Sequence, residues 1–337
     1  MSLAQDPRAM AELELGSPPG PDGQVTTTPT PPRRRRGGGG LLGGLLGNAK
    51  AAWGLVILIL FVLMAVFAPV LAPGDPTLIQ GIGSQPPSPE HWLGTTAKGQ
   101  DVLALNIWGS RSSLFVGFTV GILATFVGLL VGLASAYLGR TLDNVLSLVT
   151  NVFLLLPGLP LLVILAAFLP QGLGTVILVL VITGWAGSAR VLRSQAMSIR
   201  GKDFVAASQV TGEGGLRIMF REMLPNMASI VMSTFLACVI FGIGAQAGLE
   251  FLGLGDISTI SWGTNLYWAS NDGALLTGAW WVFVPPGVCI ALVAFALALV
   301  NYGVDETTNP RLRRPRRRTT PDAPTRVAPR TRKETAR

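Results

Sequence analysis

The chain has 337 residues, of which 49% are hydrophobic and 13% are charged, and its mean hydropathy is +0.50. A soluble protein of this length usually carries about a quarter charged residues, so the composition argues against that class. A net charge of +8 with clustered arginines indicates instead a membrane protein with basic ends.

The N-terminal region is expected to be a disordered cytoplasmic tail over residues 1–47. Residues 1–36 are rich in Pro, Thr and Gly and end in Arg33–Arg36, and the glycine-rich residues 37–47 are typical of a flexible lead-in. The apolar run that follows imitates a signal peptide. Its long basic lead and its lack of a small-residue cleavage site favour a retained membrane anchor.

Six apolar runs approach the length of about 20 residues that a helix needs to cross a hydrocarbon core of about 30 Å. We therefore predict an all-α polytopic protein with six transmembrane helices. Prolines predict kinks in the third run, at Pro157 and Pro160, and in the sixth, at Pro285 and Pro286. Recurring glycines in the second run predict close helix packing. The predicted spans are Trp53–Leu71, Leu114–Leu138, Val145–Leu169, Gly174–Val191, Ala228–Leu249 and Trp280–Tyr302.

The basic residues predict the orientation. If the N-terminus lies inside, every Lys and Arg except Lys98 and Arg111 falls in an inside segment. The positive-inside rule then places both termini in the cytoplasm, which requires an even number of spans. Tryptophan supports this orientation as a belt at the outer interface, because six tryptophans fall in outer loops or at outer span ends: Trp92, Trp108, Trp262, Trp268, Trp280 and Trp281.

Residue types that carry catalysis are scarce. His91 is the single histidine, so neither a histidine metal cluster nor a Ser-His-Asp arrangement is predicted. Cys238 and Cys289 fall within spans and are expected to be buried apolar residues. No phosphate-binding G-x-x-x-x-G-K-[ST] loop occurs, so ATP hydrolysis by this chain is not expected. Asp143 and Glu250 lie near span ends, where we expect water or lipid headgroups to solvate them.

A polar insert, Asp203–Asn226, separates the fourth and fifth apolar runs. It predicts two short helices that meet at a glycine cluster around Gly212 and end at Leu224-Pro225, because glycine permits positive φ and proline removes a hydrogen-bond donor. Small residues on the first helix would let another surface approach its backbone.

This insert resembles the cytoplasmic coupling loop of ABC-transporter permeases, with its Glu-Ala-Ala…Gly…Ile-x-Leu-Pro pattern. Aligned on Gly212 and Leu224-Pro225, the acidic residue of the pattern falls on Ala206, and its isoleucine falls on Glu222. The spacing is retained, although the acidic residue is missing.

The segment before the second span, HWLGTTAKGQDVLALNIWGSRSSL, is similar to dipeptide and oligopeptide permeases of the type I ABC importers. Thr96 and Gln100 replace the Asp and Arg of that family. Later matches are Leu249–Gly255 and Ser261–Gly263, and one span before an outer loop, followed by five more, is the layout of the C-type subunit. Ten residues of the segment match: His91, Leu93, Gly94, Thr95, Gly99, Asp101, Gly109, Arg111, Ser113 and Leu114.

The resemblance implies the organisation of the chain. Residues 48–112 would hold the anchor span and an extracytoplasmic segment, and residues 113–304 a five-helix permease core. The coupling loop would lie at about 194–226. The resemblance leaves both tails out, and the Arg-, Pro- and Thr-rich composition of the C-terminal end predicts a disordered cytoplasmic tail over residues 305–337. Gly94, Thr95 and Gly99 would shape the outer segment, where Asp101 is expected to pair with Arg111.

The resemblance also implies the partners. A second, related permease would complete the translocation path, two cytoplasmic ATPase subunits would bind ATP and Mg, and an extracytoplasmic binding protein would deliver the solute. Arg217 and Arg221 would meet either acidic groups of an ATPase or lipid phosphates. The residues implied in ATPase coupling are Phe204, Val205, Ala206, Ala207, Ser208, Gly212, Arg217, Arg221, Leu224 and Pro225.

The implied function is inward transport of short peptides across the bacterial plasma membrane. Oligosaccharides, nickel complexes and other small solutes remain alternative cargoes. A channel would need a ring of carbonyls or charges, a secondary carrier would need ionisable residues deep in its spans, and a membrane enzyme would need clustered ionisable residues. The sequence indicates none of these, and the basic tails lack the interleaved aromatic residues expected of nucleic-acid binding.

Overall fold

A computed structural model describes residues 48–308, which are predominantly helical and contain one isolated β-bridge, between Thr95 and Asp101. Residues 1–47 and 309–337, which include most of the two predicted tails, lie outside the described residues. The last helix extends to Thr308 and so passes the predicted start of the C-terminal tail at residue 305.

Within the described residues, five helices are long and apolar enough to cross a membrane. A bent pair, α6 (Arg140–Leu155) and α7 (Gly158–Phe168), makes a sixth span if the two are counted together. This finding confirms the polytopic all-α class. The five single helices are α3 (Ala49–Val66), α5 (Val102–Tyr137), α8 (Leu173–Arg200), α12 (Ala228–Phe251) and α14 (Trp280–Thr308).

The predicted third span is not a straight helix, because α6 and α7 meet at 88°. Leu156, which precedes Pro157, has a ψ of 133°, and a residue before proline is driven toward this extended conformation by the proline ring. Pro160 lies in the first turn of α7, where a missing N–H costs little. Pro285 and Pro286, in contrast, lie inside α14, which continues as one helix.

Helix α5 begins well before the predicted span, at Val102 instead of Leu114. The Asp101 carboxylate starts this helix by accepting a 2.9 Å hydrogen bond from the Ala104 N–H. Gly109 and Arg111, which the resemblance assigns to the extracytoplasmic segment, therefore belong to α5. At about 1.5 Å per residue, the 36 residues of α5 span about 54 Å.

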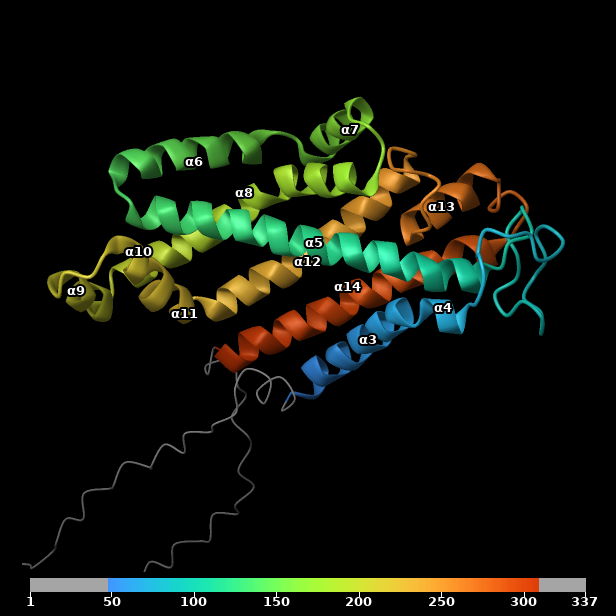
Figure 1. Cartoon of the computed structure of the whole chain (residues 1–337), viewed down its shortest axis with the longest axis horizontal. Coiled ribbons are helices and arrows are strands. Elements are labelled where there is room, and N and C mark those ends of the chain that lie inside the picture. Colours follow the sequence, from blue (N-terminus) through green and yellow to red (C-terminus); the bar gives the residue numbers. More distant parts are fainter. Residues whose placement is uncertain (1–47, 309–337) are drawn as a thin grey trace, which may run out of the picture. The chain divides into compact units, whose positions relative to one another are not determined.

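Glycines on α5 allow α8 and α12 to approach it closely, and the three helices lie side by side in Figure 1. One pair of these glycines faces Val239 and Ile243 of α12, and the other pair faces Ser188 and Ala189 of α8. The predicted small packing face is thus confirmed. The four buried glycines are Gly117, Gly121, Gly128 and Gly132.

Trp262 is fully buried, so its assignment to an outer interfacial belt is wrong. Its indole Nε1 donates to the Asn106 carbonyl at 3.1 Å, and its ring meets the edge of Phe61 with centroids 5.8 Å apart. The reason is that Trp262 begins α13 (Trp262–Asn271), a short helix that packs against α5, α12 and α14. Trp92 and Trp280, in contrast, are exposed.

The environments of Asp143 and Glu250 also differ from expectation. Glu250 is 3% exposed and accepts hydrogen bonds from Ser261 Oγ and Gln246 Nε2, so it is not solvated by water or headgroups. Glu250 lies next to the last residue of α12, and it is buried because α13 folds back over this end of the helix. Asp143 is paired with Arg193 of α8, at 2.7 Å from its Nε, and this contact ties α6 to α8.

The glycine face of α5 gives a first prediction. A Cβ at Gly128 would lie 2.6 Å from the Ser188 Cβ, so Gly128→Val should separate α5 from α8 at a cost of about 1–3 kcal/mol. Thermal unfolding of the purified protein in detergent should show a lower midpoint. Gly187→Val is the matched control, because a Cβ at that helical glycine meets nothing within 4 Å. Equal midpoints for the two variants would contradict close packing at Gly128.

Candidate functional site

The insert between α8 and α12 is a chain of short helical pieces. Helix α9 (Asp203–Val210) is followed, after a turn, by α10 (Gly215–Arg217), the π-helical turn η1 (Ile218–Met223) and α11 (Leu224–Asn226). The predicted arrangement of two helical parts around a glycine turn is therefore present. Below, residues 203–226 are called the coupling segment.

Pro225 does not end the second helical part, contrary to the prediction. The chain stays helical through Pro225 to Asn226, and the Met227 N–H still donates to the Leu224 carbonyl at 3.0 Å. Proline is tolerated here because it occupies the first turn of α11, directly after a π-helical turn that has already shifted the hydrogen-bond pattern.

Gly212 turns the chain after α9 with a φ of +79°, which confirms the predicted left-handed conformation. The Gly212 N–H donates to the Gln209 carbonyl at 3.1 Å, and the Glu213 N–H donates to the Ser208 carbonyl at 3.1 Å. These two bonds form a Schellman motif, which satisfies the last carbonyls of the helix. A Cβ at Gly212 would meet nothing within 4 Å, so glycine is required by the backbone and not by crowding.

One side of the coupling segment is anchored in the helical bundle. Val205, Ile218 and Met223 are fully buried in a cluster with Leu133 of α5 and Leu192 of α8. Val205 was expected to dock a partner, but it lies in this internal cluster and offers no surface. Packed side chains therefore join the segment to α5 and α8.

Other positions of the segment carry apolar residues that nothing within residues 48–308 covers. Phe204 is 39% exposed, Leu216 is 66% exposed and Val210 is 89% exposed, and Ala206 and Ala207 are also exposed. We call these five residues the coupling surface. Sequence reasoning missed Val210 and Leu216, although each is an apolar residue in an otherwise polar stretch and flanks the Gly212 turn.

The other residues implied in ATPase coupling are partly buried or exposed. Ser208 and Leu224 are partly buried, and Pro225 is exposed. Arg217 reaches Glu213 at 3.7 Å, and its side chain remains 58% exposed. Arg221 is exposed and forms no ion pair within residues 48–308. The two arginines are thus available to an anionic partner or lipid.

At the other end of α5, Asp101 organises the segment of residues 72–101 that precedes the helix. We call it the outer segment, after its predicted extracytoplasmic location. Asp101 also caps α5, and its Oδ2 lies 2.8 Å from Nδ1 of His91. The predicted pairing of Asp101 with Arg111 is wrong, because the Arg111 guanidinium lies over the Trp108 ring, 5.2 Å from its centroid. The helix separates the two residues, since Asp101 precedes α5 and Arg111 lies on its third turn.

Thr95 and two glycines hold this outer segment together. The buried Thr95 donates from Oγ1 to the Ile82 carbonyl at 2.7 Å, and its carbonyl accepts from Trp281 Nε1 at 3.3 Å. Gly94 and Gly99 have φ values of +69° and +77°, which favour glycine. The structure thus brings Gly94, Thr95, Gly99 and Asp101 together.

Residues 48–308 contain no group of three or more His, Cys, Asp or Glu that could hold a metal ion.

The geometry of this part of the chain presents two candidate surfaces at opposite ends of α5. One is the coupling surface beside the C-terminal end of the helix. The other is the outer segment that precedes its N-terminal end.

Two families match the chain in succession. Residues 45–87 match the family described as the N-terminal TM domain of oligopeptide transport permease C. Residues 124–314 match the family described as the inner membrane component of binding-protein-dependent transport systems. The second match covers the coupling segment and more than half of the chain.

Related proteins agree with these matches over most of the chain. A dipeptide transport system permease protein of Bacillus subtilis is 34% identical over 79% of this chain and 83% of its own length. An oligopeptide transport system permease protein of the same species is 32% identical over 79% of this chain and 87% of its own. A protein of the latter name from Mycobacterium tuberculosis is 32% identical over 77% of this chain and 90% of its own.

The cap of α5 gives a second prediction. Asp101→Ala removes the acceptor of the Ala104 N–H and the partner of His91, so we expect a loss of about 1 kcal/mol, measured as a lower thermal unfolding midpoint in detergent. Asp101→Asn should keep most of the stability, because asparagine caps helices about as well as aspartate. Glu90→Gln, which removes an exposed charge of the outer segment, is the control. A wild-type midpoint for Asp101→Ala would show that the cap contributes nothing.

Proposed function

Because the chain belongs to the family of inner membrane components of binding-protein-dependent transport systems, we propose that it is the C-type permease subunit of an ATP-binding-cassette importer of short peptides. It is a multi-pass membrane protein and a transporter component. The peptide cargo is supported by the names of relatives that are 32–34% identical to this chain.

The observation that carries the proposal is the two-sided construction of the coupling segment. Val205, Ile218 and Met223 fix one side in the bundle, whereas Phe204, Val210 and Leu216 are exposed on the other. An exposed apolar group of this kind marks an interaction surface. We assign it to a groove of a cytoplasmic ATPase subunit, whose movement on ATP binding would pull on α5 and α8 through the buried cluster.

The proposed assembly contains four further components. A second, related permease would enclose the path together with this chain, two ATPase subunits would bind ATP and Mg, and an extracytoplasmic binding protein would deliver the peptide. Energy conversion belongs to the ATPases in this scheme, and this chain acts as the mechanical link and half of the path. Arg217 and Arg221 would add attraction to acidic groups beside the ATPase groove or to lipid phosphates.

Cargo of another chemistry, such as an oligosaccharide or a nickel complex, is the alternative within the same class. The binding protein makes the first selection of solute, so the decisive observation lies outside this chain. Purification of the whole assembly, followed by mass spectrometry of the solute retained on its binding protein, separates the cargoes. A retained short peptide supports the proposal, and a retained sugar or metal complex contradicts the cargo while leaving the transporter class intact.

The proposed orientation puts the coupling segment in the cytoplasm and the outer segment outside the bacterial plasma membrane. In a background without Cys238 and Cys289, a cysteine at exposed Thr211 should resist an impermeant thiol reagent in intact cells. A cysteine at exposed Glu90 should react. Both should react after the membrane is permeabilised, which serves as the control for accessibility. Labelling of the Thr211 site alone in intact cells would invert the topology.

Gly212 supplies the test of coupling. Gly212→Val forces a β-branched residue into the left-handed region, a strain of about 1–3 kcal/mol that should distort the turn under the coupling surface. We expect peptide uptake by the reconstituted assembly to fall about tenfold, with insertion and permease pairing retained.

Gly214→Val is the matched control, because Gly214 has a φ of −66° and a Cβ there meets nothing within 4 Å. It should transport at close to the wild-type rate. ATPase activity stimulated by loaded binding protein, measured in parallel, distinguishes loss of docking from uncoupled turnover. Normal uptake and normally stimulated ATPase activity in Gly212→Val would refute the coupling assignment.

A further inference from the structure

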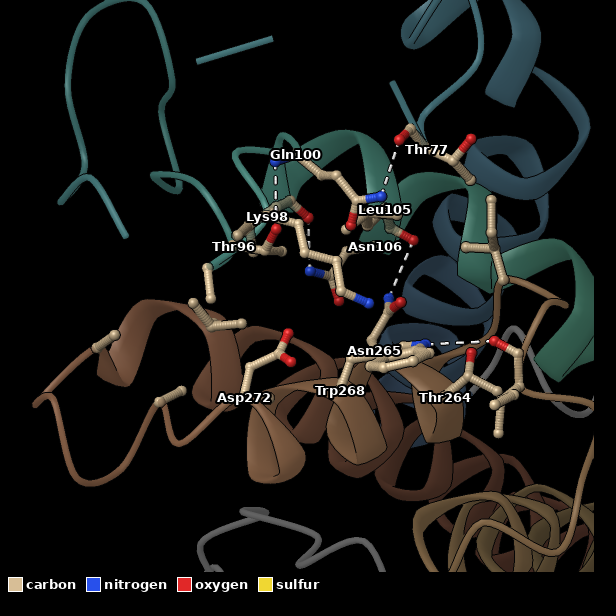
Figure 2. A pocket seen from close by; sticks show the side chains of 18 of the residues that line it. Thr77, Thr96, Lys98, Gln100, Leu105, Asn106, Thr264, Asn265, Trp268 and Asp272 are labelled. Carbon is tan, nitrogen blue, oxygen red and sulfur yellow. Dashed lines mark hydrogen bonds between the residues drawn. The ribbon is translucent and has the colours of Figure 1, made fainter. Parts of the chain in front are cut away.

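A cavity of about 300 Å³ lies between the outer segment, the first turns of α5, and α13. It is at the end of α5 opposite the coupling segment. Figure 2 shows Lys98 extending toward Trp268, with Asp272 nearby, while the Gln100 side chain turns toward the Thr77 carbonyl. Cavities that bind small molecules occupy about 300–1,000 Å³, so this one suits a small ligand.

Part of the cavity wall is apolar and buried. It is formed by small and branched side chains that are all at most 9% exposed, and Val102 begins α5 beside them. Trp268 is held in place because its Nε1 donates to the Ile257 carbonyl at 3.2 Å. These apolar residues are Val102, Leu105, Ala269, Ala274, Ala279 and Val282.

Asn106 places an unsatisfied hydrogen-bond acceptor in this wall. The residue is 4% exposed, and its Nδ2 donates to the Val102 carbonyl at 2.8 Å. Its Oδ1, however, is buried without a hydrogen-bond partner. A buried polar atom of this kind costs about 1–3 kcal/mol, and it makes Asn106 a polar residue within an otherwise apolar part of the cavity lining.

One positive and one negative side chain flank the same space. The Lys98 ammonium lies 3.2 Å from the centroid of the Trp268 ring, which fixes the cation at the cavity. Asp272 is partly buried, and its carboxylate accepts no hydrogen bond and forms no ion pair within residues 48–308. Because Lys98 and Asp272 are not paired with each other, each can bind a separate charge of one ligand.

The geometry points to a binding site for a zwitterionic dipeptide in this cavity. The carboxylate of the peptide would bind Lys98, and its ammonium would bind Asp272. An aliphatic side chain would lie on the apolar wall beside Trp268. This inference rests on the proposed function, since it makes the cavity a place on the permease itself that receives the cargo, and it limits that site to very short peptides.

Direct binding tests the site without the binding protein. The assembly of the permease pair and its ATPases, reconstituted in nanodiscs, is titrated with alanyl-leucine by isothermal calorimetry. We expect saturable binding, which Lys98→Met and Asp272→Asn each weaken about tenfold. Glu90→Gln, which removes an exposed charge outside the cavity lining, should bind as the wild type does. Unchanged thermal midpoints exclude misfolding of the variants.

Blocked peptides assign each end of the ligand. Alanyl-leucine amide should bind the wild type about tenfold more weakly than alanyl-leucine, and Lys98→Met should weaken it no further. N-acetyl-alanyl-leucine should likewise bind the wild type about tenfold more weakly than alanyl-leucine, and Asp272→Asn should weaken it no further. Equal effects of both variants on all three peptides would contradict the proposed placement.

Uptake separates this inference from the proposed function. If the assembly imports alanyl-leucine with its binding protein and ATP, but shows no binding without the binding protein, the cavity site is refuted and the importer stands. If neither uptake nor binding occurs for any short peptide, the peptide-importer proposal itself fails. The assembly could instead bind the binding protein but not alanyl-leucine, with no competition between the two. That result would assign the cavity to the binding protein and overturn the peptide site.

Discussion

The close approach of α8 and α12 to the glycine face of α5 is the constraint on which the rest of the structure depends. Gly117, Gly121, Gly128 and Gly132 remove the side chains that would otherwise separate these helices. Inside a membrane, lipid tails satisfy apolar surfaces as well as protein does, so helix association relies on such close packing. Because α5 is long, one packed helix links the capped outer segment at Asp101 to the buried cluster around Leu133.

That arrangement also joins the coupling segment to the bundle. The segment packs on α5 and α8 through its buried residues and carries exposed apolar residues at other positions. Gly212 allows the sharp turn that presents α9, and the Schellman bonds keep that turn from fraying. The break at Leu156-Pro157, in contrast, leaves α6 and α7 at 88° to each other, and the Asp143–Arg193 pair ties α6 to α8.

Buried polar groups in this membrane protein serve to join elements. Glu250 connects α12 to the start of α13 through Ser261, and a Cβ at Gly263 would lie 2.8 Å from the Ala247 Cα, so glycine permits this contact. Buried polar groups are costly unless hydrogen-bonded, and Glu250 meets that condition with two donors. Within residues 48–308, five buried side-chain oxygens lack a hydrogen-bond partner, and the Asn106 Oδ1 beside the cavity is one of them.

The sequence by itself determined the number and approximate places of the apolar helices, the glycine face of α5, the Gly212 turn and the family, because hydropathy, helix-packing residues and motif spacing are local properties. Only the tertiary structure decided what each polar or aromatic residue meets. Trp262 and Glu250 are buried because α13 folds back onto α5 and α12, Val205 faces inward because α9 packs on the bundle, and Asp101 caps α5 instead of reaching Arg111. Such contacts join residues far apart in the chain, and no local pattern encodes them.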